Sequence, residues 1–146
     1  MAVVILRLAN VYGSRDRDRV IPLFIEQALS EKPLTVFGND KILDFHWIEN
    51  LIDVLCRASQ RPCPDLPVNV GSGKGTRLVD LAERIRALTG RGSALHISEE
   101  RWPEVSRFVA DVTAACKLFD LQCPKDPFEH LPLLIEQFRS EMRIPT

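Results

Sequence analysis

Short apolar runs alternate along the chain with stretches in which apolar residues recur every three or four positions. The first run, residues 3–8 (VVILRL), is β-branched and apolar on both faces, which is typical of a strand buried in a parallel sheet. Asn10 to Gly13 then breaks it, and helical spacing from Val20 predicts a helix that ends near Leu29. Further strands are expected over residues 34–37, 42–47, 68–70 and 94–97, and further helices over about 49–59, 76–89, 111–118 and from 126 onward.

Capping residues indicate where several of these helices begin and end. Thr76 is the expected N-cap of a helix that Gly90 closes. Asp111 can cap the short helix, and Asp126 opens a capping box for the last one. Pro132 lies inside that last pattern and should kink or restart the helix. Because strands alternate with helices, the expected fold class is α/β.

The composition narrows the function classes without choosing one. The 146 residues suit one domain or a domain and a fragment, with 45% hydrophobic and 27% charged residues. A net charge of -1 argues against nucleic acid as the main partner, because phosphate contacts need a basic excess. No apolar run reaches membrane-spanning length, and the opening run is too short for a secretory signal. We therefore expect a soluble, cytoplasmic protein without a membrane partner.

The four cysteines are Cys56, Cys63, Cys116 and Cys123, and their spacing lacks the close pairs of zinc sites. Cys56 and Cys116 fall inside apolar helical patterns and are predicted to be small core residues. A metal site or a disulfide is the less favoured interpretation.

Other sequence signals for catalysis are weak. The segment GSGKGT, residues 71–76, lies between a strand and a helix, but a P-loop would place its first glycine at Val68 and a hydroxyl residue at Gly75. These glycines are therefore expected to shape a tight turn. The three histidines are scattered with no nucleophile beside them, and Asp16 and Asp18 are interpreted as solvated loop charges.

Six segments in order resemble the second half of the NAD-dependent epimerase/dehydratase family, the extended short-chain dehydrogenase/reductases of the UDP-galactose 4-epimerase type. They are RLANVYG, RVIPLFIEQAL, PLTVFG, LDFHWIEN, VNVGSG and RWPEVSRFVAD, and the resemblance runs from about Val3 to Arg139. It implies the carboxy-terminal substrate-binding lobe joined to the last strands and helix of a truncated Rossmann sheet. Residues 1–13 and 48–71 would be the remnants of that sheet, and residues 14–47 and 72–146 would be the lobe.

The resemblance assigns residues after the first strand to the cofactor and the substrate. Leu8 and Ala9 match positions beside the nicotinamide, and Asn10 matches the family asparagine of NxYG. The amide of Asn10 suits a hydrogen bond to a diphosphate or sugar oxygen. The alternative for Asn10 is a turn residue, which asparagine also favours.

More distant segments complete the expected sugar-nucleotide site. Arg19 and Val20 match positions that contact the nucleotide, where a helix N-terminus suits an anion. Thr35 and Phe37 match positions that hold uracil, although Phe37 could instead be a core aromatic, and Phe45 is assigned to the substrate as well.

Arg101 and Glu104 complete this set in the segment RWPEV. They match the family's diphosphate-binding arginine and an acid that accepts from ribose hydroxyls. Their alternative is ordinary loop charge. In one departure, the family reads Arg-Asp-Phe/Tyr where this chain has Leu43-Asp44-Phe45, so a second phosphate arginine is absent.

The family's catalytic groups are not found in this sequence. It contains no GxxGxxG, and its single tyrosine, Tyr12, has Asp16 rather than lysine four residues on. In the family that tyrosine is the general base while NAD takes the hydride. Both parts are expected upstream of residue 1, so the chain is interpreted as a natural truncation, a misannotated start or an expressed fragment. NAD or NADP is expected in the full-length parent, and none for this chain alone.

Three functional hypotheses follow. The first is an enzyme fragment, inactive alone, from a UDP-sugar isomerase of the epimerase type, a dehydratase or a decarboxylase. The second is a stand-alone module that binds a nucleotide sugar or a protein without catalysis, and the third is a half-enzyme completed by a separate dinucleotide domain. An unpaired apolar strand edge would also favour a homo-oligomer.

Overall fold

The computed structural model describes residues 3–61, 66–98 and 105–142, and its elements follow the expected alternation. The helices are α1 (Val20–Leu29), α2 (Ile48–Gln60), α3 (Leu78–Thr89), α4 (Thr113–Phe119) and α5 (Leu131–Met142). The strands are β1 (Leu6–Leu8), β2 (Asn10–Tyr12), β3 (Leu34–Phe37), β4 (Ile42–Trp47), β5 (Val68–Val70), β6 (Gly75–Arg77), β7 (Leu95–Ser98) and β8 (Arg107–Phe108). The predicted α/β class is confirmed.

The strands form three small sheets in which most pairings are parallel. β1 pairs with β5, and β3 pairs with β7, both in parallel. In the third sheet β4 has β2 and β8 as parallel neighbours and β6 as an antiparallel one. The longest strand, β4, therefore organises the centre of the molecule.

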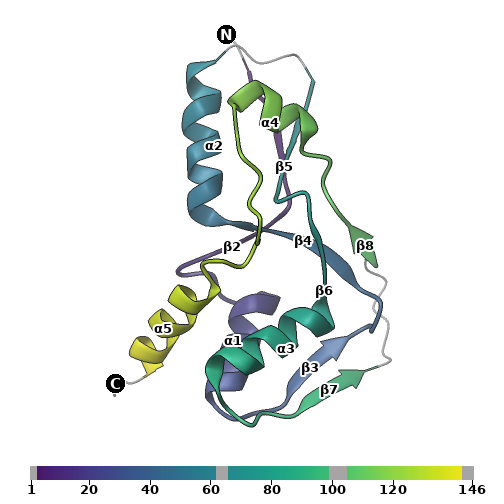
Figure 1. Ribbon diagram of the computed structural model, residues 1–146, viewed down its shortest axis with the longest axis vertical. Coiled ribbons are helices and arrows are strands. Elements are labelled where there is room, and N and C mark those ends of the chain that lie inside the picture. The colour runs from purple at the N-terminus through teal and green to yellow at the C-terminus, as the bar shows by residue number, and fades with distance from the viewer. Residues whose placement is uncertain (1–2, 62–65, 99–104, 143–146) are drawn as a thin grey trace.

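Two hydrophobic cores lie at opposite ends of the molecule (Figure 1). The larger one packs α1, α3 and α5 around β3 and β4, while the smaller one packs α2 and α4 with β5. β2 and β4 run between them. The smaller core also takes partly buried side chains from β1 and β2, among them Leu6 and Val11.

A buried carboxylate on β4 ties the centre together. Asp44 is fully buried, and its Oδ1 accepts hydrogen bonds from Ser72 N (2.9 Å) and Ser72 Oγ (2.6 Å). Its Oδ2 accepts from Gly73 N (3.0 Å) and Ala110 N (3.2 Å). Such charge-assisted bonds offset the cost of burying the charge. One side chain thus joins three stretches of chain that are far apart in sequence.

The glycines after β5 shape a tight turn, as predicted. Gly73 has φ +71, a conformation that glycine adopts without steric cost. A Cβ on Gly71 would lie 2.7 Å from Asp44 Oδ2, so only glycine fits there. The N–H groups of Ser72 and Gly73 already donate to the Asp44 carboxylate, so a carboxylate of the protein occupies the anion-binding groups of this turn.

Some predicted helix starts were wrong. Thr76 is not an N-cap, because it lies in β6 opposite Leu43, and α3 begins two residues later. The last helix begins at Leu131 rather than Asp126, which puts Pro132 in its first turn, where proline costs nothing. Residues 126–130 are not helical, so Pro132 neither kinks nor restarts the helix, and that expectation was wrong. Asp111 does accept from Thr113 N at 3.0 Å.

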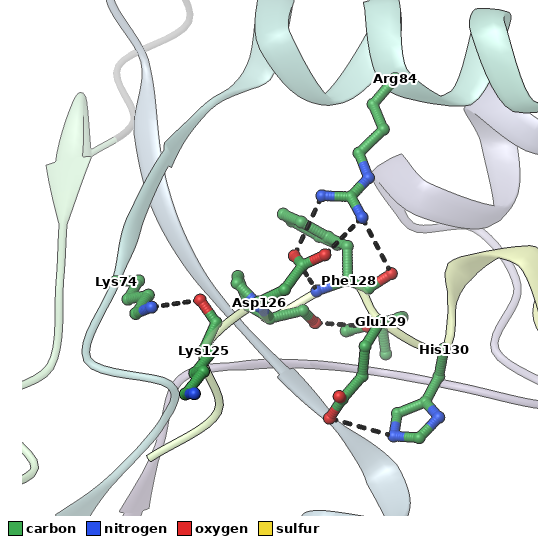
Figure 2. A network of polar contacts seen from close by, with 9 residues as sticks. Lys74, Arg84, Lys125, Asp126, Phe128, Glu129 and His130 are labelled. Atoms are coloured by element: carbon green, nitrogen blue, oxygen red, sulfur yellow. Dashed lines mark hydrogen bonds and ion pairs between the residues drawn. The ribbon is translucent and has the colours of Figure 1, made fainter.

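Asp126 instead holds the segment before α5 against α3. The Arg84 guanidinium donates two hydrogen bonds to the Asp126 carboxylate (Figure 2). Their lengths are 3.0 and 2.5 Å. Asp126 Oδ1 also accepts from Phe128 N at 3.0 Å. Arg84 helps to hold the pKa of Asp126 below its usual range, mainly through these hydrogen bonds.

Two further predictions about burial were also wrong. Cys56 is exposed rather than a core residue, and Cys116 is only half-buried. The first strand is parallel, as expected, but it is shorter than the predicted run and has one neighbour among the described residues. Apolar side chains of the run are exposed to solvent: Val3 and Ile5 before the strand and Leu8 at its end. Within the described part of the chain, no helix is long and apolar enough to cross a membrane.

The Asp44 network predicts a large loss of stability for Asp44→Asn. An amide cannot accept all four bonds, and its own N–H would face buried donors, so we expect a loss of about 3 kcal/mol in the free energy of unfolding. Urea denaturation followed by circular dichroism measures it.

Asp80→Asn is the matched control, because the Asp80 side chain is exposed on α3, with its carboxylate 3.9 Å from Arg77. It should cost less than about 0.5 kcal/mol. Equal losses in the two variants would contradict the proposed importance of the buried network.

Candidate functional site

A cavity of about 260 Å³ opens where β2 and β4 lie side by side and α1 begins. It is lined by residues of both strands, of the loop between β2 and α1, and of the first turn of α1: Asn10, Val11, Tyr12, Asp16, Arg19, Val20, Ile21 and Phe45. Four of the residues assigned from the sequence to the substrate therefore meet in one place: Asn10, Arg19, Val20 and Phe45.

Asn10 is fixed by the strand pairing. It lies in β2, directly opposite Phe45. The first strand does end before Asn10, but the expectation that residues 10–13 are irregular was wrong for residues 10–12. Its Nδ2 donates to the backbone carbonyl of Asp44 at 3.0 Å. The residue that anchors the central network thus also orients the amide at the cavity.

The start of α1 brings backbone N–H groups and one cation to the same cavity. Arg19 is the N-cap residue, and no side chain caps the helix there. The N–H groups of Val20 and Ile21 have no partner within the helix and carry partial positive charge, which favours an anion, while Pro22 has no N–H to add. Arg19 adds a guanidinium beside them.

Asp16 is the acid of the cavity, and the sequence interpretation of it as a solvated loop charge was wrong. Its side chain is 19% exposed, and its Oδ2 is buried with no hydrogen-bond partner in the structure. Burial raises the pKa of Asp16, although Arg19, whose Nε lies 3.7 Å from Oδ1, acts in the opposite direction. A hydroxyl or amine donor would complete its hydrogen bonding.

Tyr12 has a structural role. It is buried, and its hydroxyl donates to Pro127 O at 2.6 Å. Its ring packs against Trp47 and Phe128, with centroid distances of 5.2 and 5.8 Å. Burial raises the pKa of Tyr12 well above its ordinary value of 10. A tyrosine that acts as a general base must be accessible and must lose its own proton readily. Tyr12 is buried and its pKa is raised, so it suits this role in neither respect.

Four other assigned residues do not line this cavity. Thr35 and Phe37 lie on β3, which pairs with β7 and not with the strands of the cavity, and Phe37 is 43% exposed rather than a core aromatic. Leu8 is 46% exposed at the end of β1, while Ala9 is buried and its N–H donates to Val70 O at 2.8 Å. Arg101 and Glu104 lie outside the described residues.

A larger hollow of about 730 Å³ lies among α2, α4, β5 and the segment after α4. The strand β4 contributes to both spaces, since Phe45 lines the small cavity and the neighbouring His46 lines the large one. Burial lowers the pKa of His46, and both of its ring nitrogens are buried without a partner in the structure. Asn50 and the Asp53–Arg57 ion pair supply polar groups from α2.

Sequence reasoning missed Asp16, Asp44 and His46. A signal existed for the two residues on β4, because a charged residue and an imidazole inside an apolar strand must find partners or a cavity. For Asp16 no signal was available, since its burial depends on how the loop folds back onto α1.

Comparison with known proteins points to one family. Residues 1–71 match the model of the NAD dependent epimerase/dehydratase family. A protein named as an uncharacterized UDP-glucose epimerase, YtcB, of Bacillus subtilis (strain 168) is 32% identical over 119 residues, covering 80% of this chain and 38% of that protein. UDP-glucuronic acid decarboxylase 1 of Xenopus tropicalis is 30% identical over 145 residues, covering 96% of this chain and 34% of that protein.

Solved structures share the fold. UDP-glucuronic acid 4-epimerase from Bacillus cereus, in complex with UDP-glucuronic acid and NAD, matches with a TM-score of 0.85 at 24% identity, covering 94% of this chain and 45% of that one. The chain thus spans less than half the length of these relatives. The resemblance inferred from the six sequence segments is confirmed.

Asp16 gives a prediction about pH. Its pKa is raised in the folded chain, so ionised Asp16 destabilises the fold above that pKa, and the penalty disappears as the pH falls below the unfolded value near 3.8. We expect Asp16→Asn to raise the melting temperature at pH 7 and to change it little near pH 3. Thermal melts at both pH values measure this, with exposed Asp18→Asn as the control. A lower melting temperature for Asp16→Asn at pH 7 would contradict the prediction.

Proposed function

The chain is related to the NAD-dependent epimerase/dehydratase family, and on that premise we propose that the cavity between β2, β4 and α1 binds a nucleoside-diphosphate sugar. The observation that carries the proposal is the convergence of Asn10, Arg19 and Phe45 on one 260 Å³ cavity at the start of α1. A diphosphate would meet the Arg19 guanidinium and the N–H groups of the helix. Phe45, which is buried in the larger core, contributes to the apolar wall of the cavity.

Within this proposal Asp16 binds the neutral part of the ligand. A carboxylate repels a diphosphate but accepts readily from the hydroxyls of a ribose or a hexose. Its buried Oδ2, which has no partner in the structure, would gain one. In this proposal Arg19 therefore binds the phosphates of the ligand, and Asp16 binds one of its hydroxyl groups.

The departure at Leu43 is consistent with this division. Leu43 is partly buried and packs against the larger core, and its apolar side chain cannot bind a phosphate. The positive charge at the cavity then comes from Arg19. A contribution of Arg101 and Glu104, and of Thr35 and Phe37 to uracil, stays a prediction from the resemblance.

We also propose that NAD or NADP acts in the complete enzyme, as an epimerase, dehydratase or decarboxylase. Leu8 fits the assigned contact with nicotinamide, because its side chain is exposed at the end of β1. Ala9 fits less well, since its side chain is buried and its N–H is already bonded to Val70. Residues 1–13 and 48–71 would then complete a dinucleotide-binding sheet, with the lobe formed by 14–47 and 72–146.

The apolar edge of β1 is the proposed contact with further protein. Val3 and Ile5, just before β1, are more than half exposed, and backbone groups of the adjoining strand edge pair readily with another strand. The partner is a dinucleotide-binding half or, when this chain is alone, a second copy of it. Binding of a sugar nucleotide by the isolated chain would favour the stand-alone module among the three hypotheses.

Calorimetric titration with UDP and UDP-glucose tests the binding site. Arg19→Gln should weaken both by about five- to tenfold, because it removes a charge-assisted bond to phosphate. Arg17→Gln is the matched control two residues away, since Arg17 pairs with Glu141 and does not line the cavity. Equal affinities of wild type and Arg19→Gln, or no binding by wild type, would overturn the proposal.

Sedimentation tests the β1 edge. The chain alone should sediment as a dimer or larger, and Ile5→Lys should shift it toward monomer by adding charge at the edge. Ile52→Lys serves as the control, because Ile52 is exposed to the same degree on α2, 51% against 52% for Ile5. A wild-type monomer at high concentration would exclude this contact.

A further inference from the structure

Two cysteine thiols face each other outside the proposed sugar-nucleotide cavity. Cys116 lies on α4, and Cys123 lies in the segment that follows that helix. Their Sγ atoms are 2.9 Å apart. A disulfide requires about 2.05 Å, so the sulfur atoms need to approach by less than roughly 1 Å. Cys56, which is exposed on α2, provides an internal comparison without such a neighbour among the described cysteines.

The turn between the two thiols is held by contacts independent of sulfur. Asp120 ends α4 in the left-handed conformation with φ 52, and Leu121 N donates to Cys116 O at 3.1 Å. Arg57 of α2 donates to the carbonyls of Phe119 and Asp120, both at 3.1 Å. The carbonyls of Cys116 and Phe119 at the end of α4 thus have partners, and the chain leaves the helix in a fixed direction.

The chain is anchored again just after Cys123. Lys74 Nζ donates to the carbonyl of Lys125, and Arg84 grips Asp126, as Figure 2 shows. Residues on both sides of Cys123 are therefore fixed to other elements. The proximity of the thiols follows from these contacts and does not depend on a bond between them.

We propose that Cys116 and Cys123 are a redox-active dithiol that a low-molecular-weight disulfide, such as oxidised glutathione, converts into an intrachain disulfide. The Cys123 thiolate attacks one sulfur of the small disulfide and releases one small thiolate. Cys116 then loses its proton to water, and its sulfur attacks the Cys123 sulfur and releases the second small thiolate. Two protein thiols are oxidised and one small disulfide is reduced to two thiols.

The surroundings favour this order of attack. Cys123 is exposed, so an external disulfide can reach it, whereas Cys116 is half-buried. Burial, together with the hydrogen bond to Cys123, raises the pKa of the Cys116 thiol to about 11, so Cys116 carries less thiolate and is the poorer first nucleophile. Since the second step joins groups already in contact, the mixed disulfide should be short-lived.

The new bond would change the larger hollow. Both cysteines line the 730 Å³ space, as do Asn50 and His46. A disulfide would tie the segment after α4 to the helix and fix that wall of the hollow. The inference is independent of the proposed function, because neither cysteine lines the sugar-nucleotide cavity.

Peptide mapping after incubation in oxidised glutathione tests the pairing. Trypsin cleaves after Arg107, Lys117 and Lys125, so each cysteine falls in its own peptide, residues 108–117 and 118–125. After an acid quench and alkylation, we expect these two peptides joined by one disulfide, with the joined species lost on reduction. Linkage of either peptide to Cys56 or Cys63 instead, or free thiols at both positions, would overturn the proposal.

Stability gives a second readout. Oxidation should raise the melting temperature of wild type and of Cys56→Ser by about 5 °C, because closing a short loop restricts the unfolded chain. Cys116→Ser and Cys123→Ser should show no such rise, and Cys116→Ser should instead accumulate the mixed disulfide at the exposed Cys123. Cys123 is exposed, so its serine variant keeps the test valid if Cys116→Ser does not fold. A rise that persists in Cys123→Ser would refute the pairing.

Discussion

The buried carboxylate of Asp44 is the interaction on which the centre of the molecule depends. A charge in the interior needs several donors, and four hydrogen bonds from Ser72, Gly73 and Ala110 supply them. These donors belong to the turn after β5 and to the segment before α4, so the acid fixes both relative to β4. Its backbone carbonyl also holds Asn10. The geometry of the proposed binding site is therefore set by a residue that is fully buried.

Most regular elements were predictable because their patterns are local. The bounds of α1, β3, β4 and β5 agree with the expected ranges, and Gly90 closes α3 in the left-handed conformation, as its position indicates. The short strands β2, β6 and β8 were missed. Their two or three residues carry no period of their own, and their strand conformation comes from pairing with β4.

The site was only partly predictable for a similar reason. The motifs placed Asn10, Arg19, Val20 and Phe45 on one ligand, and the fold brings these residues together. Nothing local showed that Asp16 is partly buried, or that Cys116 and Cys123 meet, because both depend on how a loop returns to a helix. Asp111 does accept a hydrogen bond from the first residue of α4, although Val112 and not Asp111 is the N-cap. Asp126 pairs instead with a distant arginine that no pattern near it reveals.

The strand β4 lies between the small cavity and the larger hollow and contributes residues to both. Phe45 faces one and His46 faces the other, as alternation along a strand requires. A one-residue insertion before them would exchange the aromatic ring and the imidazole and would turn Asp44 out of its ring of donors. A shift of β4 would therefore change the lining of both cavities at the same time. Variation of the ligand among related chains is instead expected in the loops that border β4.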